Sequence, residues 1–219
     1  MIDLTGKTIL VTGASRNIGA TTALTLSRAG ASVVLHYASG KQETQTIATQ
    51  IPADQCHLVQ ADLRVPQAAA TLWQQAVDWK GQIDVVVNNA ATMPYASIDA
   101  DWQTWSDTWQ TTLQVNLIAV ADLCREAIRH FKTRSGGTII NVASRAAFRG
   151  DSPDFMHYAA SKGGVIALTR SIARGFAQDG ILAFAVAPGF VQTDRIEQLM
   201  QEKGTEFVTR DIPLGSPAP

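Results

Sequence analysis

Three side chains in the second half of the chain have the types and spacing for acid–base chemistry on a carbonyl group. Tyr158 and Lys162 lie four residues apart in a helical pattern, so they share one helix face. A nearby ammonium group favours the ionised form of a phenol and so lowers its pKa. Ser144 closes the largely apolar run 138–143, where its hydroxyl group could hold a carbonyl against Tyr158. The trio predicts a proton donor for ketone reduction near neutral pH.

Tyr and Lys four residues apart also occur on ordinary solvated helices. The prediction of a catalytic site therefore depends on the elements around these residues. Apolar, β-branched runs at 8–12, 32–37, 57–61, 83–88, 138–142 and 182–186 predict strands. Helical segments between them are expected at 18–28, about 43–50, 66–79, 105–131 and 155–178. Apolar strands alternating with helices are typical of an α/β protein with a doubly wound parallel sheet, in three layers with helices on both faces. No repeat or long linker interrupts the pattern, which predicts a single domain over 1–219.

The turn after the first predicted strand has the composition of a phosphate cradle. Gly13 and Gly19 flank Ser15, Arg16, Asn17 and Ile18 between that strand and the next helix. Glycines at this place allow a pyrophosphate to approach the backbone, and the helix N-terminus favours its negative charge. The alternative is a tight turn that binds nothing.

The end of the second predicted strand indicates which dinucleotide would bind. An acidic residue there would bind the adenosine ribose and repel a 2′-phosphate, but Tyr37 is followed by Ala38 and Ser39. Arg16, Ser39 and Lys41 instead offer positive charge and hydrogen bonds. This favours NADP(H) over NAD(H), unless Lys41 is simply a solvated lysine at a helix start.

Taken in order, these motifs resemble the short-chain dehydrogenase/reductase family from about Leu4 to the C-terminus. The turn 12–19 matches the family's cofactor turn, with Asn17 in place of a glycine, and 88–91 matches its Asn-Asn-Ala-Gly run with Ala91 as the last residue. Asparagine tolerates a left-handed backbone, so we expect the turn to survive. The resemblance implies a Rossmann-type fold and adds cofactor contacts from Asp62 and Leu63 to adenine, from Asn89 and Ala90 after the fourth strand, and from Pro188, Gly189, Val191 and Thr193 to the nicotinamide.

The resemblance also implies a catalytic tetrad. Asn116, Ser144, Tyr158 and Lys162 match its four positions. In the implied mechanism Tyr158 donates a proton to the carbonyl oxygen while hydride is delivered to the carbon. Lys162 lowers the pKa of Tyr158 and binds the nicotinamide ribose, Ser144 orients the carbonyl, and Asn116 supports a water that restores the proton. A buried asparagine in a helix could also simply satisfy backbone groups at a kink.

The substrate is less well specified than the chemistry. The chain looks nearest to the 3-oxoacyl-(acyl-carrier-protein) reductase-like branch, which implies a carbonyl or secondary alcohol substrate, with a 3-oxoacyl thioester as one possibility. The resemblance implies a substrate pocket between the loop after the fourth strand, the stretch after Ser144 and the segment Arg195 to Val208, with Met93, Tyr95 and Phe148 as its apolar residues. Arg145 and Arg149 would either meet an anionic substrate or be surface arginines. A pteridine reductase-like enzyme and a non-enzymatic dinucleotide-binding sensor are the alternatives; the complete tetrad favours an enzyme.

Three tryptophans, Trp102, Trp105 and Trp109, are spaced three and four apart. This spacing predicts a helix stripe that faces the core. An aromatic wall over a substrate or partner is the alternative.

Bulk properties exclude several partners. The formal net charge is −1, so nothing favours nucleic acid or an anionic membrane, and no apolar run has membrane-spanning length. The four histidines and the two cysteines, Cys56 and Cys124, have no metal-site spacing. We expect no metal and a cytoplasmic protein with reduced thiols.

The C-terminus departs from the family pattern. A helix and a last strand normally follow a segment like 211–219, and they are missing from this sequence. Either the chain is truncated or partly recorded, or the protein ends with six strands. If the truncation is real, we expect the sixth strand or its neighbour to be a bare edge and the chain to be less stable than a longer relative. The resemblance implies a homotetramer or homodimer, and the missing elements would remove one interface of the tetramer.

Overall fold

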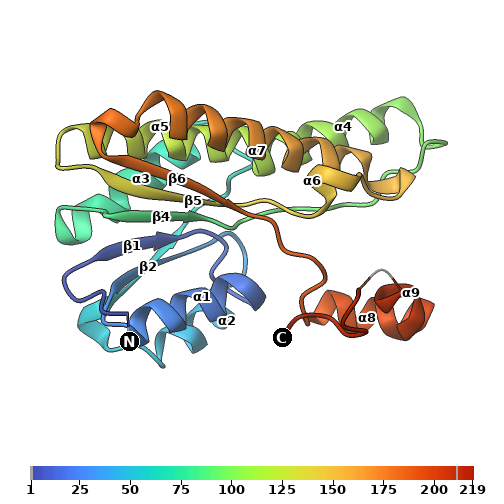
Figure 1. The fold of residues 1–219 in the computed structure, drawn as a ribbon, viewed down its shortest axis with the longest axis horizontal. Helices are drawn as coiled ribbons and strands as arrows, with labels where there is room; N and C mark the ends of the chain where they lie inside the picture. Colours follow the sequence, from blue (N-terminus) through green and yellow to red (C-terminus); the bar gives the residue numbers. More distant parts are fainter. Residues whose placement is uncertain (1, 211) are drawn as a thin grey trace.

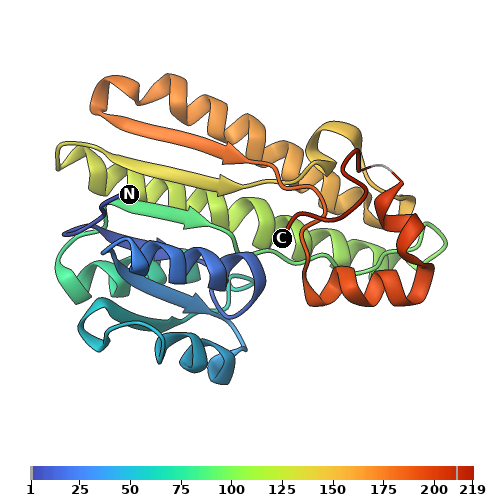
Figure 2. The same ribbon diagram turned by 60° about the horizontal axis from the view of Figure 1, so that its bottom comes forward.

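A computed structural model describes residues 2–210 and 212–219 and contains a six-stranded parallel sheet, shown in Figures 1 and 2. The strand order is β3-β2-β1-β4-β5-β6, so the order reverses between β1 and β4. This is the doubly wound arrangement that the alternation of strands and helices predicts. The strands are β1 (Thr8–Val11), β2 (Ser32–Tyr37), β3 (Cys56–Gln60), β4 (Val85–Asn88), β5 (Gly137–Val142) and β6 (Ile181–Val186).

Helices cover both faces of the sheet (Figure 1). One apolar core lies between the sheet and α3, α5 and α7, and a second joins the β1–β2 half of the sheet to α1. The helices are α1 (Asn17–Arg28), α2 (Lys41–Ala48), α3 (Ala68–Lys80), α4 (Trp102–Leu113), α5 (Ala119–Lys132), α6 (Ala146–Arg149), α7 (Met156–Gly175), α8 (Asp194–Lys203) and α9 (Thr205–Thr209), with short 3₁₀ turns η1 (Ala53–Gln55), η3 (Pro153–Phe155) and η4 (Ala177–Asp179). The predicted three-layer α/β class is therefore confirmed.

The long helix predicted over 105–131 is not uniform. It begins earlier, at Trp102, and a π-helical turn η2 (Gln114–Ile118) separates α4 from α5. Such π-turns often occur at functional sites. The core-facing stripe predicted for the tryptophans is wrong for Trp102, which is 78% exposed, while Trp105 and Trp109 are half-buried with ring centres 5.6 Å apart.

Strand β6 forms one edge of the sheet, as the sequence predicts. Within the described residues it pairs only with β5. Leu182, Phe184 and Val186 are each about half exposed. Phe184 pairs with Ile140, whose side chain packs on the second core, so this exposed apolar row lies on the face that α1 and α2 cover farther along the sheet.

The turn between β1 and α1 depends on two glycines, Gly13 and Gly19. Gly13 has φ 66°, and Asn17 has φ 51°, so asparagine does adopt the left-handed backbone expected of it. A Cβ atom on Gly19 would overlap the carbonyl oxygen of Gly13 and stand 2.6 Å from Asn89 Nδ2. The first turn of α1 can therefore lie against the end of β4 only if residue 19 has no side chain.

We expect Gly19→Ala to lower the free energy of unfolding by about 1–3 kcal/mol, because the extra methyl group must displace backbone atoms. Gly175→Ala is the matched control, since a Cβ atom at that helical residue meets nothing within 4 Å. The control should be neutral or stabilising by up to about 1 kcal/mol, from helix propensity alone. Urea unfolding of the three proteins measures both values; equal stability of the two variants would contradict the proposed close packing.

Candidate active site

The carboxyl ends of the six strands together form one edge of the sheet, which runs across the strands and is distinct from the outer strand β6. Helices α8 and α9 lie on that side (Figure 2). Thr12 joins the ends of β1 and β4 at the point where the strand order reverses. Its hydroxyl group accepts hydrogen bonds from the N–H groups of Asn89 and Ala90 at 2.9 and 3.0 Å and donates one to the carbonyl of Val87. In doubly wound sheets this reversal is where ligands bind.

The side chain of Asn89, which follows β4, also holds the predicted phosphate turn in place. Its Nδ2 atom donates to the carbonyl oxygens of Thr12 and Gly13, at 2.9 and 3.1 Å. The N-terminus of α1 follows directly, with no acidic residue in its first turn. Ala91 does not have a positive φ, so its substitution for the family's glycine costs no backbone strain.

His36 connects this turn to the end of β3. Its Nδ1 atom accepts the N–H of Gly13 at 3.1 Å, so its Nε2 atom carries the proton and donates to the carbonyl of Ala61 at 3.0 Å. The side chain is 1% exposed, and burial lowers its pKa. The neutral ring therefore holds the turn in place. Sequence analysis did not identify this role, because a histidine within a strand gives no sign of its partners.

The loop that begins α2 lies against the phosphate turn. A Cβ atom on Gly40 would stand 2.8 Å from the Cβ atom of Ser15, which shows how closely the two loops approach. Arg16, Ser39 and Lys41 are exposed at this place, whereas Tyr37 is buried. Glu43 also lies here: its Oε2 atom is 3.4 Å from the same Cβ position. The sequence gives no sign that this carboxylate lies beside the phosphate turn.

Asp62 and Leu63 follow β3 at the same edge. Leu63 is buried. The carboxylate of Asp62 forms an ion pair with Arg64, with Oδ2 and Nη2 2.7 Å apart, and hydrogen bonding from Arg64 lowers the pKa of Asp62. Asp62 is thus ionised and already has one cationic partner beside the place predicted for adenine.

Tyr158, Ser144 and Lys162 come together as the sequence predicts. Tyr158 shares a hydrogen bond with Ser144, which lowers its pKa, but burial has the larger effect and raises it. Lys162 is 2% exposed; its Nζ atom donates to the carbonyl of Val142 at 2.7 Å and lies 5.8 Å from the ring centre of Tyr158. Burial lowers the pKa of Lys162 to about 8.

The expected effect of Lys162 on the pKa of Tyr158 is not what the structure shows. The pKa of Tyr158 is raised, and the cationic side chain that lowers it is Arg195. The ammonium group of Lys162 instead donates a hydrogen bond to the carbonyl of Val142, the last residue of β5. The reason is its burial: an ammonium group enclosed between α7 and the sheet must find a hydrogen-bond acceptor there.

Asn116 lies in the π-turn and is fully buried. Its Oδ1 atom accepts the N–H of Thr92, and its Nδ2 atom donates to the carbonyl of Thr92, both at 2.8 Å. Nδ2 also contacts the hydroxyl oxygen of Ser161 at 3.2 Å. Asn116 therefore fixes the loop after β4 against α7, next to Lys162.

The segment 188–193 runs from β6 along the same edge. The carbonyl of Pro188 accepts the N–H of Arg145 at 3.0 Å, and Val191 forms a parallel bridge with Ala218. Gly189 and Thr193 complete this segment, and the hydroxyl group of Thr193 does not cap α8. The guanidinium carbon of Arg145 stands 3.8 Å from the ring centre of Phe190, so this arginine lies on the segment.

Residues from several elements surround the approach to Tyr158. Tyr95 and Phe148 are each 65% exposed, and Tyr95 packs edge-on against Phe155. His157 Nε2 contacts the carbonyl oxygen of Pro94 at 2.9 Å, which fixes the loop after β4 to α7. Arg195, from α8, lies over the ring of Phe155. The sequence places the segment 195–208 at the substrate pocket but does not distinguish Arg195, whose position becomes evident only when α8 is placed.

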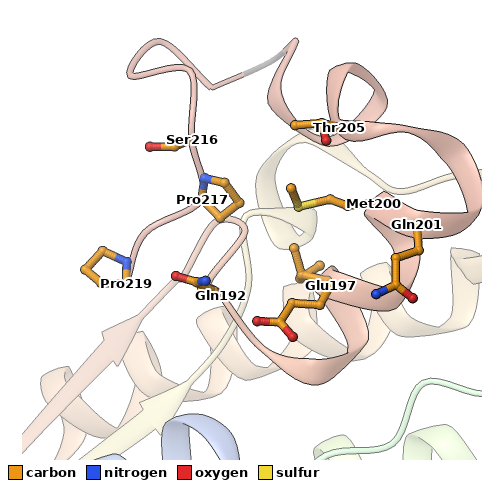
Figure 3. Close-up of a pocket in the computed structure, with 9 residues that line it drawn as sticks. Gln192, Glu197, Met200, Gln201, Thr205, Ser216, Pro217 and Pro219 are labelled. Atoms are coloured by element: carbon orange, nitrogen blue, oxygen red, sulfur yellow. The ribbon is translucent and has the colours of Figure 1, made fainter.

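A cavity also lies away from these residues. It has a volume of about 550 Å³ and lies between α8, α9 and the C-terminal residues (Figure 3). None of the predicted site residues lines it. Its lining consists of Gln192, Ile196, Glu197, Met200, Gln201, Thr205, Ser216, Pro217 and Pro219. In the part of the chain that the structure describes, no group of three or more His, Cys, Asp and Glu could hold a metal ion, and no helix is long and apolar enough to cross a membrane.

We expect His36→Phe to lower the free energy of unfolding at pH 7.5 by about 1–3 kcal/mol and to weaken dinucleotide binding, because Gly13 and Ala61 lose their partner. The pKa of His36 is lowered in the folded state, so its contribution is complete above the unfolded pKa of about 6.5 and declines as the pH falls. The cost of the substitution should therefore be smaller at pH 5.5.

Urea unfolding at the two pH values and NADPH titration measure these effects. His57→Phe is the control: the pKa of His57 is also lowered by burial, but the ring stacks on Trp79, away from the turn. If both variants bind NADPH equally well, His36 does not support the turn.

Comparisons with known proteins agree with this geometry. The family model for short chain dehydrogenases matches residues 7–204. A 3-oxoacyl-[acyl-carrier-protein] reductase of Synechocystis is 35% identical over 211 residues, covering 95% of this chain and 83% of that protein. A 3beta-hydroxysteroid dehydrogenase of Eggerthella lenta is 35% identical over 218 residues, covering 97% of this chain and 82% of that protein.

A solved structure described as a candidate NAD(P)-dependent gluconate 5-dehydrogenase from Beutenbergia cavernae, with bound NADP at low occupancy, gives a TM-score of 0.88 at 32% identity. The match covers 99% of this chain and 86% of that one. The resemblance to 3-oxoacyl-(acyl-carrier-protein) reductases is confirmed, and the chain belongs to the short-chain dehydrogenase family.

Proposed function

We propose that the chain is an NADP(H)-dependent oxidoreductase that reduces a carbonyl group or oxidises a secondary alcohol. The observation that carries this proposal is the hydrogen bond between Tyr158 and Ser144 beside the buried Lys162. These groups lie at the end of β5, and the phosphate turn follows β1 at the same edge of the sheet. A sensor would need the turn but not this acid.

The residues at the edge of the sheet fit a nicotinamide dinucleotide. The N-terminus of α1 would bind the pyrophosphate, with Ser15, Asn17 and Ile18 around it, and Gly13 and Gly19 let this turn pack closely against the end of β4. Leu63 and Asp62 would bind the adenine, and Asn89 and Ala90 would lie beside the ribose. The nicotinamide would be bound by Pro188, Gly189, Val191 and Thr193. When bound, the nicotinamide supplies or accepts the hydride.

The chain's own residues handle the proton. Because its pKa is raised by burial, Tyr158 stays protonated at neutral pH and can donate its proton to the carbonyl oxygen. Ser144 orients that oxygen. Lys162, with a pKa of about 8, is mostly protonated at neutral pH, and its ammonium group can return a proton to Tyr158, with Asn116 supporting the path. Alcohol oxidation needs the phenolate, so it should become faster as the pH rises.

A 3-oxoacyl thioester is the first substrate to test, since the most similar relatives include 3-oxoacyl-[acyl-carrier-protein] reductases. A pteridine reductase-like enzyme is a weaker alternative, because no structural observation supports it. We further propose that the protein acts in the cytoplasm as a homodimer or homotetramer, without nucleic acid or membrane partners, in keeping with its charge.

Tyr158→Phe removes the proton donor and keeps the ring, so turnover of a reducible ketone should fall by about 10²–10⁴-fold. The affinity for NADPH should be nearly unchanged. Steady-state rates over a panel of 3-oxo esters and thioesters, with NADPH titration, measure both effects. Tyr95→Phe, which removes an exposed hydroxyl group near the same entrance, should cost far less. Undiminished turnover in Tyr158→Phe would remove this residue from the mechanism.

NADPH should bind more tightly than NADH, and the difference should depend on the cations of the α2 loop. Arg16→Gln and Lys41→Gln should each weaken NADPH binding by about tenfold, because a charge-assisted hydrogen bond is lost, and leave NADH binding little changed. Glu43→Gln should strengthen NADPH binding, since it removes a nearby negative charge. Fluorescence titration of the four proteins tests this; equal binding of NADH and NADPH by the unmodified chain would refute the assignment of NADP(H).

A further inference from the structure

We propose that Arg195 selects substrates that carry a carboxylate group close to the reacting carbonyl or hydroxyl carbon. The substrate class would then be oxo acids in the direction of reduction and hydroxy acids in the direction of oxidation. This inference rests on the proposed function, because it names what that site accepts.

Arg195 is the second residue of α8, and its side chain crosses to the opposite wall of the approach to Tyr158. Its Nη1 atom lies 3.5 Å from the carbonyl oxygen of Met93, in the loop after β4. Its guanidinium carbon stands 5.4 Å from the ring centre of Phe155. Phe155 ends the 3₁₀ turn η3 directly before α7, the helix that carries Tyr158. The guanidinium group is therefore held between the loop after β4 and the start of α7.

The charge of Arg195 reaches the reacting atoms. Its electrostatic effect lowers the pKa of Tyr158, while that of Asp151 raises it. A carbonyl group bound to Tyr158 and Ser144 would thus have a cation on the α8 side and an anion on the side of Asp151. A substrate with a single carboxylate has one favourable orientation in this field, with its acid group toward α8.

The donors of Arg195 remain available for a planar acid group. Its hydrogen bond to Met93 is at the long limit for such bonds, and the ring of Phe155 offers its N–H groups no oxygen acceptor. No ion pair involves Arg195 among residues 2–210 and 212–219. Guanidinium binds carboxylates through two parallel hydrogen bonds, a geometry that lysine cannot provide.

A purely structural role makes a different prediction. If Arg195 only held α8 against Met93 and Phe155, its loss would loosen the entrance for every substrate. Acids and their uncharged esters would then be affected alike. An anion-binding role changes the ratio between acid and ester, and this ratio is independent of the general activity of a variant.

The test uses three pairs of probes: 3-oxobutanoate, 4-oxopentanoate and 5-oxohexanoate, each with its methyl ester. The ratio of kcat/KM for acid and ester is measured with NADPH for the full chain, Arg195→Gln, Arg195→Lys and Arg170→Gln. Arg170 is the matched control, an exposed arginine of α7 about 18 Å along the helix from Tyr158. Calorimetric titration of the same probes into each protein saturated with NADP⁺ gives the ratio of affinities without any turnover.

For at least one pair, the unmodified chain and Arg170→Gln should favour the acid. Arg195→Gln should reduce the acid-to-ester ratio by about tenfold or more, and Arg195→Lys should retain part of it. Esters favoured over acids in all three pairs, or an equal loss for acid and ester in Arg195→Gln, would overturn the proposal. Acids that bind selectively without turnover would leave the role of Arg195 intact and contradict the proposed reduction instead.

Discussion

The joining of β1 to β4 by Thr12 is the interaction on which the rest of the site depends. One hydroxyl group accepts two backbone N–H groups of the segment after β4 and donates to the end of that strand. Asn89 then binds the backbone of the glycine turn, and His36 holds the same turn from β2. The reversal of strand order thus becomes a rigid cradle, because the backbone groups of Thr12 and Gly13 each have a fixed partner.

Burial affects the pKa values of Tyr158 and Lys162 as much as nearby charges do. Lys162 is enclosed between α7 and the sheet, so it bonds to Val142 and its pKa falls to about 8. Tyr158 is also largely enclosed, which keeps its proton in place near neutral pH. A phenol that holds its proton suits reduction of a carbonyl. The cation that acts on it in the described structure comes from α8, an element that carries the far wall of the entrance.

Much of the fold could be predicted from the sequence, because alternating apolar runs and helices leave few other arrangements. The strands, the glycine turn and the meeting of Ser144, Tyr158 and Lys162 follow from local pattern and from the rule that parallel strands end at one edge. The roles of Thr12, His36 and Arg195 could not be predicted, since each depends on a partner at least 23 residues away. The exposure of Trp102 and the π-turn at Asn116 were likewise hidden, because tertiary packing decides both.

The central claim is that these residues support hydride transfer between NADP(H) and a carbonyl carbon. The most direct test is to supply NADPH deuterated at the nicotinamide C4 position and to analyse the alcohol formed from a 3-oxo ester by mass spectrometry. The proposed function predicts one deuterium on the new carbinol carbon, at a rate that collapses in Tyr158→Phe. Tight binding of NADPH with no deuterium in any product would contradict it and would favour a dinucleotide-binding protein without catalysis.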